Sequence, residues 1–170
     1  MKICIFGAGA IGGLIGGRLA AAGEEVSLIA RGPHLKAIKQ SGLRIIGMDG
    51  AEETFSLLAS NDPTKLPPQD TIIVATKAHD AAVTAPTMSP LLGPNTTVVT
   101  AMNGIPWWYF FREGGPFEGT QLNSVDPRGE QWTRLGPERV LGTVVWLSAE
   151  VHAPGVIRHT TGTRLPLGEP

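Results

Sequence analysis

The feature that most restricts how this chain can fold is a glycine-rich turn near its N-terminus. Residues 7–12 read Gly-Ala-Gly-Ala-Ile-Gly and follow an apolar stretch, Lys2–Phe6, that is typical of a short buried strand. From Ala10 the apolar residues recur with helical spacing, and Gly23 is a typical residue to end such a helix. A strand, a glycine turn and a helix in this order are the context in which a G-x-G-x-x-G motif indicates dinucleotide binding.

The glycines of this motif have separate roles in such a turn. The first permits the tight turn, the second lets the backbone approach a diphosphate, and the third lets the helix pack closely on the sheet. The helix N-terminus adds unpaired N–H groups and the positive end of a dipole. A glycine-rich helix start without a ligand is the alternative, but it would only weaken the element. We therefore expect the whole turn to bind a cofactor: Gly7, Ala8, Gly9, Ala10, Ile11 and Gly12.

Apolar segments further along the chain predict an α/β fold. A second strand, Val26–Ala30, precedes a helix over Pro33–Gln40, and this β-α-β-α order is typical of a parallel sheet with crossover helices. The other expected elements are a hairpin or two short edge strands at Leu43–Ile46 and Thr54–Leu58, strands Thr71–Ala75 and Thr96–Ala101, helices from Ala78 and over Pro106–Arg112, a loop over Glu113–Arg139, and closing strands Val140–Val151, Val156–Thr160 and Arg164–Leu167. The pattern predicts a Rossmann-like, doubly wound, mostly parallel sheet with extra C-terminal strands.

The residue at the end of the second strand indicates which dinucleotide fits. NAD-binding folds usually place a carboxylate about 20 residues after the glycine motif, where it binds the ribose 2′-hydroxyl. Here that strand ends in Arg31, whereas Glu24 and Glu25 precede the strand. A guanidinium suits a 2′-phosphate through a charge-assisted bidentate contact. We therefore expect NADP rather than NAD; a solvated arginine is the alternative.

Two polar residues follow later strands. Lys77 comes after Thr71–Ala75, and Asn103 comes after Thr96–Ala101. Ligands of open α/β sheets bind outside the carboxyl ends of the strands, so both residues are candidates for the site. Taken alone, each also has an ordinary explanation, because strand-end lysines are commonly solvated and Asn-Gly is a common turn pair.

The motifs together resemble the ketopantoate reductase (2-dehydropantoate 2-reductase) family. The resemblance rests on six segments in order: Gly-Ala-Gly-Ala-Ile-Gly-Gly at 7–13, Arg-Gly at 31–32, Lys-Ala at 77–78, Asn-Gly-Ile at 103–105, Pro-Gly-Val-Ile-Arg-His at 154–159 and Leu-Gly-Glu at 167–169. It implies reduction of the ketone of 2-dehydropantoate, or a similar 2-keto acid, by NADPH on the way to pantothenate. It also implies that Arg31 meets the 2′-phosphate and that Ala149 lies beside the cofactor. Lys77 would lie near the cofactor ribose and substrate, and Asn103 near the nicotinamide and substrate.

The resemblance is incomplete in two respects. Met102 stands where the family commonly has Gln or His. Family members also continue into a helical C-terminal domain that supplies a lysine thought to act as general acid, and we expect this domain to be absent from the chain. Residues 1–170 would then be one NADP-binding domain that binds NADP(H) with little or no reductase activity alone. A non-catalytic NADP-binding or sensor domain, and an α/β module without a ligand, are the alternatives.

Charge and composition argue against several other classes of protein. The net charge is −1, so no basic field favours nucleic acid or an anionic membrane surface. The sequence contains no run of 18 uncharged apolar residues, so no membrane-spanning segment is predicted. The single cysteine, Cys4, fits a reducing compartment such as the cytoplasm, and the four histidines lack the spacing of metal ligands.

Five adjacent aromatic residues, at positions 107–111, are the remaining unusual feature. They cannot all face one side of a helix, because neighbouring residues differ by about 100°. Part of the segment is therefore expected to be exposed, and an exposed aromatic surface would favour a homo-oligomer.

Overall fold

The computed structural model describes all 170 residues and contains two β-sheets. The elements are β1 (Lys2–Phe6), α1 (Ala10–Ala21), β2 (Glu25–Ile29), α2 (Gly32–Ser41), β3 (Leu43–Ile46), β4 (Glu52–Phe55), β5 (Leu58–Ser60), η1 (Pro63–Lys65), β6 (Gln69–Val74), α3 (Ala78–Thr84), η2 (Ala85–Leu91), β7 (Leu92–Thr100), η3 (Pro127–Gly129), α4 (Glu130–Leu135), η4 (Pro137–Arg139), β8 (Val140–Thr143), β9 (Trp146–Ala153), β10 (Val156–Arg164) and β11 (Leu167–Gly168). The four η elements are short 3₁₀ helices. The predicted α/β class is confirmed.

The larger sheet has the order β11-β8-β7-β6-β1-β2-β5, and all its pairs are parallel except the one between β11 and β8. In this sheet β2 and β5 lie on one side of β1, whereas β6, β7 and β8 lie on the other side. The carboxyl ends of β1 and β6 therefore lie beside a topological switch point, where ligands of such sheets bind. Side chains of β1 alternate between the two faces, so Ile3 and Ile5 join one core cluster and Cys4 and Phe6 the other.

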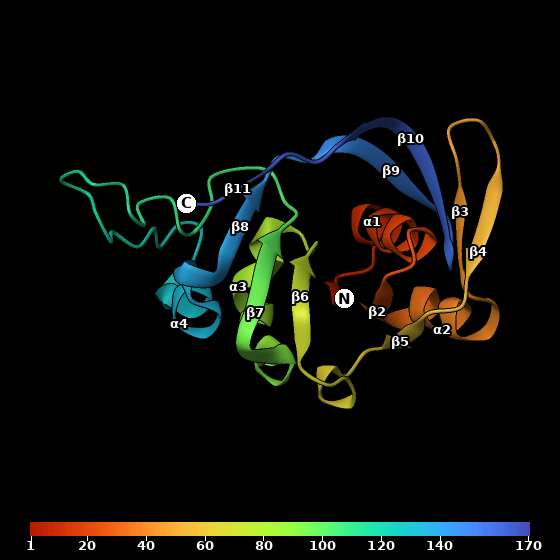
Figure 1. Ribbon diagram of the computed structural model, residues 1–170, viewed down its shortest axis with the longest axis horizontal. Helices are drawn as coiled ribbons and strands as arrows, with labels where there is room; N and C mark the ends of the chain where they lie inside the picture. Colours follow the sequence, from red (N-terminus) through yellow and green to blue (C-terminus); the bar gives the residue numbers. More distant parts are fainter.

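The smaller sheet, β4-β3-β10-β9, covers the outer side of α1, and Figure 1 shows β9 and β10 arching over that helix. The glycines of α1 let it lie between the two sheets. A Cβ at Gly16 would lie 3.0 Å from the Ile5 side chain in the larger sheet, and one at Gly17 would lie 2.7 Å from Ile45 in the smaller. The repeated glycines thus permit close packing on both sides of one helix. The sequence predicts these strands, but not their assembly into a second sheet.

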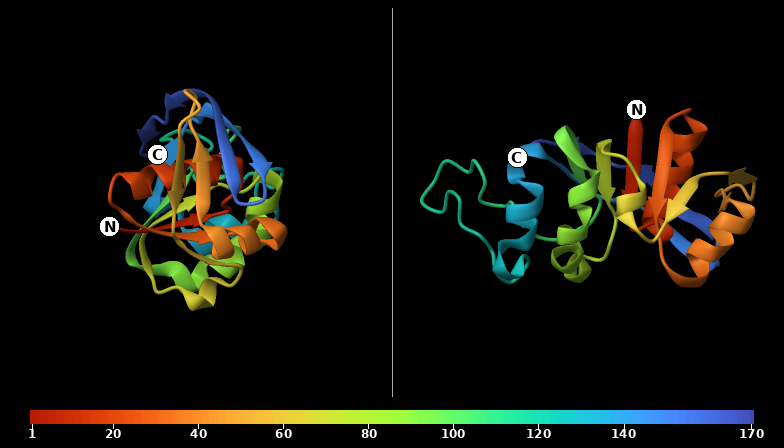
Figure 2. Two further views of the ribbon diagram at one scale, coloured as in Figure 1. Left: turned by 90° about the vertical axis from the view of Figure 1, so that its right-hand side faces the viewer. Right: turned by 90° about the horizontal axis from the view of Figure 1, so that it is seen from below.

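The opposite face of the larger sheet is covered by α3, η2 and α4. Their buried side chains, among them Met88, Leu91 and Leu135, form the second core cluster together with Trp107. Burial raises the pKa of the Cys4 thiol in this cluster to about 12, as expected for an inert core residue. Figure 2 shows the segment before α4 extending away from the rest of the molecule.

Several predicted elements were wrong. The segment Pro106–Arg112 forms successive turns rather than a helix, and its Trp107 and Phe111 rings both contact Trp132 edge-on. The expected loop Glu113–Arg139 contains α4. Its start is fixed by the buried Asp126 carboxylate, which accepts the backbone N–H groups of the second and third residues of the helix.

Strand boundaries also differ from the prediction. The expected strand Val140–Val151 is two strands, β8 and β9, which belong to different sheets. The expected strand Thr54–Leu58 is likewise split between β4 in the smaller sheet and β5 in the larger. Apolar periodicity predicts extended segments, but it does not indicate where the chain leaves one sheet and enters another.

Candidate functional site

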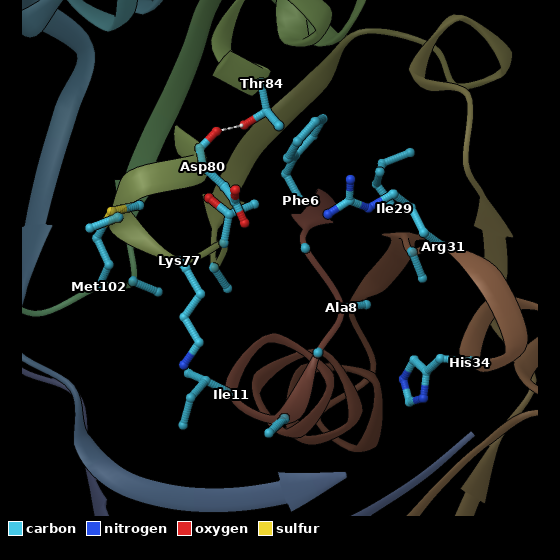
Figure 3. A pocket seen from close by; sticks show the side chains of 18 of the residues that line it. Phe6, Ala8, Ile11, Ile29, Arg31, His34, Lys77, Asp80, Thr84 and Met102 are labelled. Carbon is cyan, nitrogen blue, oxygen red and sulfur yellow. Dashed lines mark hydrogen bonds between the residues drawn. The ribbon is translucent and has the colours of Figure 1, made fainter. Parts of the chain in front are cut away.

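The carboxyl ends of the central strands open into a cleft of about 950 Å³. The cleft is lined by the glycine turn, by the ends of β1, β2 and β6, by the loop after β7, and by β9. Figure 3 shows it from close by, with the start of α1 on one side and α3 on the other. The lining residues include Gly7, Ala8, Gly9, Ala10, Ile11, Arg31, Lys77 and Asn103, so the structure brings most of the predicted site residues together.

The glycine turn has the geometry of an anion site. Gly7 has a φ of +98°, and a Cβ there would lie 2.9 Å from the backbone nitrogen of Thr76, so glycine is required at this position. The first helical hydrogen bond of α1 runs from Gly13 N–H to the Gly9 carbonyl at 2.7 Å. The three N–H groups before it have no acceptor in the chain, and the first turn of the helix holds no acidic residue: they belong to Ala10, Ile11 and Gly12.

Gly9 and Gly12 differ in their surroundings. Nothing lies within 4 Å of a Cβ built on Gly9, which is exposed at the cleft. A Cβ on Gly12 would instead contact the Gly7 carbonyl oxygen and lie 2.9 Å from the Ile5 side chain. Gly12 is buried and does not line the cleft, so it serves the packing of α1 on the sheet, whereas Gly9 leaves open space where a ligand would lie.

Two cationic side chains border this turn. Arg31 follows β2, precedes α2 and extends into the cleft, and Lys77 extends from the start of α3 toward Ile11 (Figure 3). Neither forms an ion pair or hydrogen bond with the chain, so both cations are free for a ligand. The only carboxylate that lines the cleft is Asp80, on α3 rather than at the end of β2.

Asn103 and Ala149 lie at the far side of the cleft, toward the smaller sheet. Asn103 is exposed and lines the cleft, but its amide is engaged with the backbone of Val145. Ala149 is half-buried on β9 and packs against the core; it does not line the cleft, although Leu147 and Val151 on either side of it do. The predicted residue Ala149 is therefore placed next to the cleft rather than in its wall.

Sequence reasoning missed two polar residues of the cleft. The hydroxyl of Thr76 is buried without a hydrogen-bond partner, and so is Nε2 of His34. Burial lowers the pKa of His34, partly offset by a backbone group of Ala8 that raises it. His34 lies in the first turn of α2, and no local sequence pattern indicated that its side chain would line the cleft.

The aromatic segment at positions 107–111 is sorted by burial. Trp107 is 3% exposed, whereas Tyr109 is 55% exposed, and Phe117 in the following loop is 56% exposed. Tyr109 packs edge-on against Phe110, which in turn contacts Phe117. The expected exposure of part of this segment is thus present, and self-association through it stays a prediction.

Two negative findings complete the description of the surface and side chains. No helix is sufficiently long and apolar to cross a membrane. No group of three or more His, Cys, Asp or Glu side chains is arranged to hold a metal ion.

The sheet order, the glycine turn and the cleft at the switch point define a Rossmann-like α/β domain. Residues 3–107 match the family described as Ketopantoate reductase PanE/ApbA, and the chain belongs to this family. The predicted resemblance is therefore confirmed.

Individual relatives agree with this assignment. The chain is 52% identical to a 2-dehydropantoate 2-reductase of Mesorhizobium japonicum, over all of this chain and 52% of that protein. It is 33% identical to the enzyme of the same name from Pyrococcus abyssi, over 94% of this chain and 45% of that protein. The chain thus spans about half the length of these relatives.

Solved structures show the same fold. A PanE/ApbA family ketopantoate reductase from Ralstonia eutropha superimposes with a TM-score of 0.79 at 30% identity, over 98% of this chain and 49% of that one. The 2-dehydropantoate 2-reductase of Geobacter metallireducens does so with a TM-score of 0.79 at 25% identity, over 99% of this chain and 49% of that one. D-mandelate dehydrogenase, solved with NADH, shares the fold with a TM-score of 0.80 at 24% identity.

Proposed function

We propose that residues 1–170 form the NADP(H)-binding domain of a reductase that converts the ketone of 2-dehydropantoate, or a similar 2-keto acid, to the hydroxy acid. The observation that carries the proposal is that one cleft holds both backbone N–H groups without an acceptor and an arginine side chain without a partner in the chain. The free N–H groups of Ala10 and Ile11, which line the cleft, would bind the diphosphate, and the unpaired guanidinium of Arg31 would bind a phosphate on the adenosine ribose.

The choice of NADP over NAD rests on the charge at the end of β2. A carboxylate there would accept a hydrogen bond from the ribose 2′-hydroxyl of NAD and would repel a 2′-phosphate. Arg31 occupies this place, and the single carboxylate of the cleft, Asp80, lies on α3 across from it. The names of the relatives are compatible with either nicotinamide cofactor, so this assignment depends on Arg31.

Reduction of a ketone needs a hydride, which NADPH supplies when bound, and a proton for the alkoxide. Both Lys77 and Asn103 line the cleft, so Lys77 would lie near the cofactor ribose and the keto acid, and Asn103 near the nicotinamide and the keto acid. The small side chain of Ala149 on β9 would lie beside the cofactor. The resemblance assigns the general acid to a lysine of a helical domain, which these 170 residues do not contain. We therefore expect cofactor binding with little or no turnover, in a protein of the cytoplasm whose buried Cys4 stays reduced.

Parallel fluorescence titrations of the 170-residue chain with NADPH and NADH test the proposal. NADPH should bind and NADH should bind more weakly by about tenfold or more, because one charge-assisted hydrogen bond is worth about 1.5–3 kcal/mol. Failure of both to bind would refute a cofactor domain, and equal binding would refute the role of Arg31. Rapid reduction of 2-dehydropantoate by the chain alone would refute the need for an outside proton donor.

A further inference from the structure

Asn103 is followed by Gly104 in an exposed segment beside the cleft. Both residues are exposed, and neither belongs to a helix or strand. Asn103 also lines the cleft, so a chemical change in its side chain changes the cleft itself. Asparagine is among the thermally labile residue types, and glycine is the least hindered residue that can follow it. The other asparagines precede Asp, Thr and Ser: Asn61, Asn95 and Asn123.

The backbone nitrogen of Gly104 is unobstructed. It forms no hydrogen bond with the chain, and nothing lies within 4 Å of a Cβ built on this residue. Asp49-Gly50 provides a contrast, because the Gly50 N–H donates to the Gly47 carbonyl at 3.0 Å. The nitrogen after Asp49 is therefore engaged in a hydrogen bond, whereas the nitrogen after Asn103 is not.

The side-chain carbonyl of Asn103 is polarised by a backbone donor. Val145 N–H donates to Oδ1 at 2.9 Å, and Nδ2 donates in turn to the Val145 carbonyl. A donor at this oxygen stabilises the negative charge that develops on it when a nucleophile adds to Cγ. The Gly104 nitrogen is the nucleophile that the chain itself supplies, because its attack on Cγ closes a succinimide ring.

We propose that Asn103-Gly104 is a site of spontaneous modification, at which the neutral amide in the cleft is converted to a carboxylate. The Gly104 nitrogen gives its proton to solvent and forms a bond to Cγ of Asn103. The bond from Cγ to Nδ2 breaks, and Nδ2 takes up a proton from solvent and leaves as ammonia. Water then opens the succinimide at either carbonyl, which gives aspartate or isoaspartate. Water is the only co-reactant.

The two products change the cleft in different ways. Aspartate keeps an acceptor for the Val145 N–H, but it adds a negative charge to a cleft whose one carboxylate is Asp80. Isoaspartate adds the same charge and also directs the main chain through Cβ and Cγ, so the side-chain amide that pairs with Val145 is lost. The conversion is independent of the proposed function, whereas its effect on cofactor binding rests on that function.

Peptide mapping of the full chain after incubation in mildly alkaline buffer tests the conversion. Aspartate and isoaspartate should accumulate at position 103, and isoaspartate should form about tenfold or more slowly at Asn123 and Asp49. Isoaspartyl methyltransferase labelling identifies the isoaspartate. Equal accumulation at Asp49 would overturn the role assigned to the free Gly104 nitrogen.

A synthetic peptide of residues 100–106 gives the rate without the fold. The folded chain should convert at no less than about one-tenth of the peptide's rate, a barrier difference of at most about 1.4 kcal/mol. A slower rate in the folded chain would show that the pair with Val145 protects Asn103, and this result would overturn the proposal.

Two substitutions check the origin of the signal. Asn103→Gln should remove most of the isoaspartyl labelling, because the longer side chain would have to close a larger ring. Asn123→Gln is the matched control and should leave the labelling unchanged; the opposite pattern would overturn the proposal. If Asn103→Gln fails to fold, the mapping of the original chain still decides.

Binding of NADPH tests the effect on the cleft. The converted chain, separated by anion exchange, should bind NADPH about threefold or more weakly than the unconverted chain, because the added charge repels the phosphates. Equal affinity would overturn the effect assigned to the cleft. If the unconverted chain binds no NADPH, the proposed function fails, while the mapping still decides whether Asn103 is modified.

Discussion

The side-chain amide of Asn103 pairs with the backbone of Val145 as a neighbouring strand would. Val145 N–H donates to Oδ1 at 2.9 Å, and Nδ2 donates to the Val145 carbonyl at 3.2 Å. Val145 lies where the chain passes from β8 in the larger sheet to β9 in the smaller. Asn103 therefore fixes this crossing, and one amide hydrogen and one lone pair of the side chain remain for a ligand.

Removing this pair should loosen the crossing. Asn103→Ala should lower the free energy of unfolding by about 0.5–1.5 kcal/mol for each lost hydrogen bond, toward the lower value because Asn103 is exposed. Asn103→Asp keeps the acceptor for the Val145 N–H but turns a carboxylate oxygen toward the Val145 carbonyl. Hydrogen exchange should show the Val145 amide unprotected in the Ala variant and protected in the Asp variant. Equal protection in both would show that the pair does not form in solution.

Alanine at two glycines of the motif should separate ligand binding from packing. Gly9→Ala should fold normally, because its φ of −81° suits alanine and nothing lies within 4 Å of the new Cβ, yet it should weaken NADPH binding by about tenfold or more. Gly12→Ala should lower the melting temperature, because its Cβ would meet the Gly7 carbonyl inside the core. Thermal melts and NADPH titrations of both variants check this, and a stable Gly12→Ala would contradict the packing role.

Arg31→Ala should separate the two nicotinamide cofactors. The loss of the guanidinium should weaken NADPH binding by about 1.5–3 kcal/mol, or roughly 10- to 150-fold, and leave NADH binding nearly unchanged. Arg18→Ala is the matched control, because this arginine is exposed on α1 and pairs with Glu53 outside the cleft. Titration calorimetry with both cofactors makes the comparison, and equal losses for the two would refute the assignment of Arg31 to the 2′-phosphate.

Protonation of His34 should destabilise the fold in mildly acidic solution. The pKa of the folded state lies below the ordinary value of 6.5, chiefly because of burial, so the unfolded chain binds the proton first as the pH falls. The stabilising contribution is therefore complete above pH 6.5 and is lost as the pH falls from 6.5 toward the folded pKa. Urea unfolding across this range should show a steeper loss for the original chain than for His34→Asn. His79→Asn, at a side chain that is 80% exposed, should behave like the original chain.

The sequence predicted the parts of the site that depend on local geometry. The glycine turn needs only a strand, three glycines and a helix, and Arg31 and Lys77 follow strands directly, so their meeting at one edge of the sheet follows from parallel topology. The pairing of Asn103 with Val145 and the bond between His34 and Gly155 could not be predicted in this way. Both join segments that meet only because the chain leaves one sheet for another, and no local pattern marks that crossing.

The exposed aromatic side chains near the end of the larger sheet should cause the chain to self-associate. Tyr109 and Phe117 expose more than half of their surface and are linked through Phe110, so they form one continuous apolar area. Replacing both with Ser should reduce the average mass in concentrated solution, as measured by light scattering, without lowering the melting temperature. Val83→Ser is the control, because this apolar side chain on α3 is 78% exposed and lies outside the aromatic segment. A monomeric original chain at high concentration would contradict the prediction, and an equal effect of Val83→Ser would show that general surface hydrophobicity, rather than this area, causes the association.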